Sequence, residues 1–114
     1  MDDNLFWNIR CRPLFFPKKV EWQRNLIVPV ECEDKGVKRH IKIEGDLLGH
    51  FLYAIYNFYN APITLEDLVH HSDDGLNKSC KELLESGEQV CWADLMGDKI
   101  WFHGIKDNQL LLTE

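Results

Sequence analysis

The sequence predicts an α+β domain, in which an antiparallel sheet carries two or three helices packed on one face. Three observations lead to this fold class. Residues 46–60 place apolar side chains three and four positions apart, as in an amphipathic helix. Two β-branched segments precede that helix, and two tight-turn pairs, Gly97-Asp98 and Asp107-Asn108, follow it. Strands at both ends with helices between them are typical of helices that cover one face of an antiparallel sheet.

The chain has 114 residues, of which 45% are hydrophobic and 11% aromatic, and this predicts one folded domain, 1–114, rather than disorder. We divide the domain into four parts. They are an extended arm rich in aromatic and basic residues (1–24), a β-hairpin (25–44), a helical segment (45–87) and a β-meander (88–114).

The first two parts are expected to be extended. Pro13 and Pro17 interrupt the aromatic-rich arm, which predicts an irregular edge strand or a segment without regular structure. The β-branched segment 26–32 predicts a strand, and Pro29 within it favours a place near a sheet edge. Alternating residues in 37–43 predict the second strand of a hairpin.

The main helix is predicted over 46–60. Asp46 suits an N-cap or first-turn position, where a carboxylate stabilises the helix, and Pro62 stops the helix. The stripe that we expect to face the core is formed by Leu48, Phe51, Leu52, Ile55, Phe58 and Tyr59.

Two shorter helices are expected next. Thr64 and Asp67 have the spacing of a capping box for a short helix that continues to His70. Either Asp73 or Asp74 is positioned to cap a third helix. The apolar face of that helix is formed by Leu76, Cys80, Leu83 and Leu84. Gly87 is expected to end the helix.

The last part is predicted to be a three-stranded meander. Residues 89–95 form its first strand, and Gly97-Asp98 makes a type II′ turn into 100–105. Asp107-Asn108 then makes a second tight turn into 110–113.

Charge is unevenly distributed along the chain. Residues 1–42 contain nine Lys or Arg against six Asp or Glu, whereas residues 43–114 contain four against thirteen, and the net charge is −6. Because an acidic body repels polyanions, nucleic acid is not expected to be the main partner.

The sequence contains no apolar run near the roughly 20 residues that a bilayer-spanning helix needs, and its first residues do not resemble a signal peptide. We therefore expect a soluble intracellular protein that does not insert into membranes. The four cysteines are scattered without a C-x-x-C pair, so we expect them to be reduced.

Motifs spread over nearly the whole chain resemble an uncharacterised domain family found in fungi and in giant DNA viruses. The matching residues are Leu5 to Ile9 with Pro13, then Asp46-Leu47-Leu48, Ala54-Ile55, Phe58, Pro62, Thr64 and Glu66, and finally Ala93-Asp94-Leu95, Gly97, Phe102 to Ile105 and Leu110 to Leu112. Asn8 departs from the family pattern, which has an acidic residue there. The resemblance implies a small α+β fold and no established activity. The short, insertion-free form favours a viral member, which would act in the host cytoplasm, the nucleus or the virion.

Two clusters contain residue types that are typical of metal-binding or catalytic sites. His70 and His71 with Asp73 and Asp74 contain metal-binding residue types, but adjacent histidines on a helix point about 100° apart and the spacing of structural metal ligands is absent. Asp94 and His103 lie on opposite sides of the expected Gly97-Asp98 hairpin, where they would be diagonal at best, with Cys91 as the only nearby nucleophile. We instead expect Asp94 to bond the neighbouring turn or a basic residue of the arm. No catalytic residue, metal ligand or cofactor is assigned.

The polar stripe of the main helix is formed by His50, Tyr53, Asn57 and Asn60. It contains no charged carboxylate or lysine, which is unusual for a solvated helix face and typical of protein interfaces, although an ordinary exposed face has a similar composition in many proteins. Trp22 lies beside basic residues in the arm and would serve as an anchor if exposed. These five residues are the predicted partner-binding set.

The sequence therefore favours a non-enzymatic protein-interaction or accessory domain, with a protein partner or a second copy in a homodimer. One alternative is a nucleic-acid-binding factor that uses the basic arm, namely Arg10, Arg12, Lys18, Lys19 and Arg24. The other alternative is a small enzyme with a His/Asp site, which would require a polar cleft with converging titratable groups.

Overall fold

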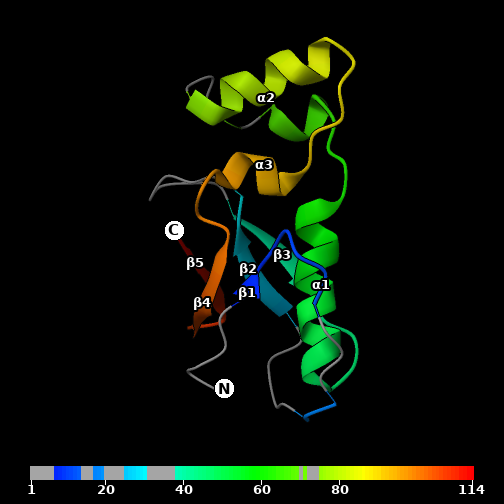
Figure 1. Cartoon of the computed structure of the whole chain (residues 1–114), viewed down its shortest axis with the longest axis vertical. Helices are drawn as coiled ribbons and strands as arrows, with labels where there is room; N and C mark the ends of the chain where they lie inside the picture. The colour runs from blue at the N-terminus through cyan, green and yellow to red at the C-terminus, as the bar shows by residue number, and fades with distance from the viewer. Residues whose placement is uncertain (1–6, 14–16, 20–24, 31–37, 70, 72–74) are drawn as a thin grey trace.

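The computed structural model describes residues 7–13, 17–19, 25–30, 38–69, 71 and 75–114. Within them the chain forms a five-stranded sheet and three α-helices, which confirms the α+β class (Figure 1). The strands lie in the order β1-β4-β5-β2-β3. Their bounds are β1 Trp7–Asn8, β2 Asn25–Pro29, β3 Lys38–Lys42, β4 Trp101–Lys106 and β5 Gln109–Thr113.

The predicted hairpin is present as β2 and β3, which pair antiparallel from Asn25 with Lys42 to Pro29 with Lys38. Alternate residues of β2 enter the core, where Leu26 and Val28 are buried. The arm contributes β1, a short edge strand antiparallel to β4. An edge strand was one of the two alternatives predicted for the arm. The sequence did not indicate that β2 and β5 lie side by side and parallel.

Helix α1, Leu48–Asn60, buries the predicted apolar stripe against the sheet; of its members only Phe58 stays partly accessible. The predicted capping role of Asp46 is wrong, because the helix is preceded by Leu47 and no side chain caps it. Instead His50 reaches back, and its Nδ1 accepts the Leu47 N–H at 3.4 Å. Near the other end, the buried Tyr59 hydroxyl donates to the Pro29 carbonyl at 2.6 Å, which ties α1 to β2.

The capping box after Pro62 is confirmed, although it starts only one 3₁₀ turn, η1, Glu66–Leu68. The Thr64 N–H donates to Asp67 Oδ2 at 2.8 Å, and the Asp67 N–H donates back to Thr64 Oγ1 at 3.4 Å. Helix α2, Gly75–Glu85, follows. The residues predicted to end η1 and to cap α2, His70, Asp73 and Asp74, lie outside the described residues.

Gly87 terminates α2 as predicted, two residues after the last helical residue, Glu85. It has a φ of +90°, its N–H donates to the Leu84 carbonyl, and the Glu88 N–H donates to the Leu83 carbonyl. Both bonds together form a Schellman motif, which satisfies the last carbonyls of the helix.

The predicted strand over 89–95 is wrong, because Trp92–Met96 forms the short helix α3. The Cys91 N–H donates to Asp94 Oδ2 at 2.9 Å, an N3 carboxylate bonding back to the residue before the helix. Except for Asp94, every residue of α3 is buried, so tertiary packing rather than alternation decides the conformation.

Both predicted tight turns exist. Gly97 has φ +58° and ψ −121°, and the Lys99 N–H donates to the Met96 carbonyl, which is the geometry of a type II′ turn. It joins α3 to β4, however, and not two strands. Asp107 and Asn108, with φ of +51° and +62°, join β4 to β5 as expected.

The helices do not share one layer. In Figure 1, α1 runs along the sheet, whereas α3 lies beyond one end of the sheet and α2 lies farther out on α3. α3 contacts both α1 and α2, so it connects the helical end of the molecule to the core. None of the helices in the described part of the chain is long and apolar enough to cross a membrane.

Candidate functional site

The N-terminal arm follows α1 from one end to the other. Asn60, at the C-terminal end of the helix, donates from Nδ2 to the Ile9 carbonyl at 2.8 Å. Two turns earlier, the Tyr53 hydroxyl accepts from Arg12 Nε at 3.3 Å. At the N-terminal end the Leu48 N–H donates to the Lys18 carbonyl at 2.8 Å. The described parts of the arm therefore attach to α1 at three points.

This arrangement changes the meaning of the predicted partner-binding stripe. Tyr53 and Asn60 bond the chain's own arm, and His50 bonds the backbone at the start of its own helix. Asn57 is exposed. Trp22 lies outside the described residues. The lack of charge in the stripe is thus explained in large part by an intramolecular contact.

The arm cations predicted for nucleic acid are not gathered in one place. Arg10 lies beside α3, whereas Lys18 and Lys19 lie at the start of α1. Because α1 has 13 residues, these positions are about 20 Å apart. Arg12 lies between them, and Arg24 is outside the described residues.

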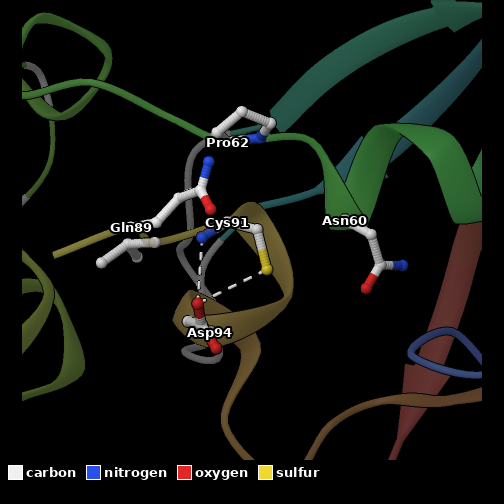
Figure 2. Close-up of a pocket in the computed structure, with 6 residues that line it drawn as sticks. Asn60, Pro62, Gln89, Cys91 and Asp94 are labelled. Carbon is white, nitrogen blue, oxygen red and sulfur yellow. Dashed lines mark hydrogen bonds between the residues drawn. The ribbon is translucent and has the colours of Figure 1, made fainter.

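Asp94 forms an ion pair with the N-terminal arm. Its Oδ1 accepts from Arg10 Nη2 at 2.8 Å, which confirms the expectation that Asp94 bonds a basic residue of the arm. Its Oδ2 accepts the Cys91 N–H at 2.9 Å and the Cys91 thiol at 3.4 Å (Figure 2). A pocket of about 200 Å³ opens beside this group and is lined by Asn60, Pro62, Gln89, Val90, Cys91 and Asp94.

The electrostatics of this pocket disfavour a nucleophile. Burial raises the pKa of the Cys91 thiol, and the Asp94 carboxylate raises it further. Burial alone would raise the pKa of Asp94, but the Cys91 N–H and the Arg10 guanidinium outweigh it and hold that pKa below its ordinary value. The neutral thiol therefore donates to an ionised carboxylate, which is the reverse of the thiolate that nucleophilic catalysis requires.

His71 belongs to an aromatic cluster rather than to a visible metal site. The ring of Trp92 stacks on that of Phe58 with 5.9 Å between the ring centroids, and its centroid lies 5.8 Å from that of His71. The Arg39 guanidinium lies over the Trp92 ring, with its carbon 4.8 Å from the centroid. Among the described residues no group of three or more His, Cys, Asp or Glu side chains could hold a metal ion. His103 lies on β4 and Asp94 on α3, so the hairpin that was expected to relate them does not exist.

The sequence interpretation missed the apolar surface at the helical end. Within the described part of the chain, five large hydrophobic side chains are exposed, and four of them lie between positions 65 and 83. They are Leu65, Val69, Leu76 and Leu83. The signal was present in the sequence, because Leu76 and Leu83 belong to the predicted apolar face of this helix, but the sequence did not show that the fold leaves these two side chains exposed.

In the comparisons with known proteins, no family model, curated protein or solved structure matches the chain.

Proposed function

We propose that this chain is a non-enzymatic accessory domain that contacts another protein through its helical end, η1 and α2. The observation that supports the proposal is the concentration of exposed apolar side chains there. Val69 is 66% exposed, and Leu65 and Leu83 are 45% and 41% exposed. Apolar surface concentrated in this way on an otherwise polar protein marks an interaction site more often than single scattered residues do.

Helix α2 has an apolar side that the fold covers only in part. Cys80, in its middle, is buried, and α2 packs on α3. Leu76 and Leu83 lie four residues before and three after Cys80, so the helix period places them on the same side. Both remain more than a third exposed, at 38% and 41%. A partner that extended this side would cover apolar surface that is now in water.

Carboxylates alternate with these apolar positions along the chain. Residues 61–98 contain nine Asp or Glu and only two Lys, and Glu66, Glu82 and Glu85 are exposed among the apolar positions. A polar rim around an apolar centre is the usual composition of a protein interface. We infer a protein partner whose own rim is basic.

The described chemistry supports a role without catalysis, because the one thiol–carboxylate pair beside a pocket holds a protonated thiol. The motif resemblance to the fungal and giant-virus family leads us to place the domain inside the cell, as an accessory or virion-associated factor of a virus of that kind. Pairing of two copies through the β3 edge is disfavoured by Lys38 and Lys42, because lysines on an edge strand oppose strand addition.

The test is size-exclusion chromatography with light scattering, on the tagged chain purified together with its co-eluting proteins. We expect a stoichiometric protein partner, retained at moderate salt, that Leu83→Arg and Val69→Arg release. Ser79→Arg adds the same charge at an exposed position of α2 and serves as the matched control. Retention by both Leu83→Arg and Val69→Arg, or a monomer free of any protein partner, would refute the proposal.

A further inference from the structure

One face of the sheet carries no helix in the described part of the chain. The registers pair Ile27 with His40, and Ile27 also with Gln109, so these side chains lie on the same side of the sheet. Gln109 pairs in turn with Lys106. The opposite side holds the core residues Leu26, Val28, Phe102 and Leu110. We call the side with Gln109 the open face, and its residues on β3, Lys38, His40 and Lys42, are all exposed.

The open face is basic although the protein is acidic. None of the five strands contains Asp or Glu, and together they contain Lys38, Arg39, Lys42 and Lys106. Arg39 turns to the core side and lies over Trp92, so three lysines remain for the open face. Along the sequence, the described carboxylates that follow the strand ends most closely are Glu44, Asp107 and Glu114.

A large aromatic side chain lies on the same face. Trp101 pairs with Thr113, which is two and four positions from Leu111 and Gln109 and therefore on their side. The Trp101 side chain is 37% exposed. Thr113 lies four positions after Gln109 on β5, so their partners on β4, Trp101 and Lys106, are about 13 Å apart along the sheet.

Hydrogen-bonding side chains on the open face include the Gln109 amide and the His40 imidazole. Lys38 Nζ donates to Gln109 Oε1 at 2.7 Å, across the intervening strand β2. This bond holds a lysine and an amide over the middle of the open face. His40 adds a group that both donates and accepts.

We propose that the open face binds single-stranded nucleic acid. Lys38, Lys42 and Lys106 contact phosphates, and a base stacks on Trp101. Charge complementarity selects a polyanion, and the partly exposed indole of Trp101 selects one with unstacked bases, because sheet surfaces recognise single strands by aromatic stacking. A duplex is disfavoured, since its major groove admits a helix or a two-stranded ribbon rather than a broad sheet face. This surface is separate from the protein-contact surface at the helical end and does not depend on it.

The test is fluorescence anisotropy of labelled single-stranded 12-mers of deoxythymidine and of uridine, with the full chain, at several salt concentrations. We expect Trp101→Ala to weaken binding about 5- to 100-fold, as loss of one stacked base does, and Trp101→Phe to restore most of it. Lys38→Gln and Lys106→Gln should each reduce the slope of log affinity against log salt by about 0.7. Lys78→Gln, on α2, is the matched control and should change neither quantity.

Thermal unfolding of each variant shows whether the fold is intact, and Trp101→Phe keeps the stacking test valid if Trp101→Ala unfolds. Three results would overturn the proposal. One is the absence of saturable binding at low salt, and another is equal binding of a duplex or of polyglutamate that Trp101→Ala leaves unchanged. The third is binding that depends on Arg12 and Lys18 of the arm while the strand lysines have no effect.

Discussion

The contact between Tyr59 and Pro29 offers a direct test of how α1 is attached to the sheet. Tyr59 is fully buried, and its hydroxyl donates at 2.6 Å to a backbone carbonyl of β2. Tyr59→Phe keeps the ring and removes only the donor. The cost is the net value of one hydrogen bond plus the penalty for an acceptor left partly buried, which together amount to about 1–2 kcal/mol. In a domain of this size each kcal/mol lowers Tm by about 4 °C.

Urea denaturation followed by tryptophan fluorescence measures this change, with an unchanged m-value as evidence that the fold is the same. Tyr53→Phe is the matched control, because it deletes a hydroxyl whose bond to Arg12 is exposed, and we expect it to cost less than about 0.5 kcal/mol. Equal losses in both variants, or no loss in Tyr59→Phe, would show that α1 is not held to β2 as described.

The same variant gives a second reading at alkaline pH. Burial raises the pKa of Tyr59 well above its ordinary value of 10.0. Below that value the folded and unfolded chains are both protonated at this residue. As the pH rises through it, only the unfolded chain ionises, so the folded protein loses stability. Tyr59→Phe removes this loss, and its stability between pH 9.5 and 11 should therefore fall less steeply than that of the wild type.

Three other changes test the surroundings of α3. Asp94→Asn should cost about 1 kcal/mol at pH 7, as loss of a helix cap does. The pKa of Asp94 in the folded protein lies below its ordinary value of 3.8, so the stability that its carboxylate contributes is lost as the pH falls below 3.8. If the difference in unfolding free energy between the wild type and Asp94→Asn persisted unchanged at pH 2–3, the assignment would be contradicted. Gly97→Ala should destabilise by about 1–2 kcal/mol in urea, because its φ is +58° and a Cβ would lie 2.7 Å from Leu76 Cδ1; a neutral effect would mean that the turn differs. In a Cys32→Ser background, Cys91 should react with a disulfide reagent at pH 7.5 more slowly than the exposed Cys11, since burial and Asp94 raise the pKa of its thiol; equal rates, followed by mass spectrometry, would refute this.

The elements that the sequence predicted correctly are those specified by neighbours in the chain. The stripe of α1 needs only its own period, and Asp107-Asn108 needs only residues that tolerate a positive φ. Residues 92–96 were assigned wrongly because their conformation depends on distant packing. The side chain of Cys91 has no oxygen of the kind that marks a helix N-cap in a sequence. Asp94 can be recognised as an N3 carboxylate only once the helix is known. The parallel contact of β2 with β5 joins segments about 80 residues apart, and no local pattern reports it.

The candidate surfaces illustrate the same limit for charge and polarity. A net charge of −6 argued against nucleic acid, yet net charge sums over the whole surface, whereas a ligand experiences the face that it approaches. Folding brings Lys38 and Lys106, 68 positions apart in sequence, to the strands on either side of the pair β2 and β5. The exposed carboxylates Glu66, Glu82 and Glu85 lie instead on η1 and α2, at the helical end. The uncharged stripe of α1 was interpreted as a partner-binding face, whereas in the fold the arm of the same chain bonds two of its four positions. Surfaces for a protein and for a nucleic acid can therefore coexist on this small domain, because the fold separates an acidic apolar end from a basic sheet.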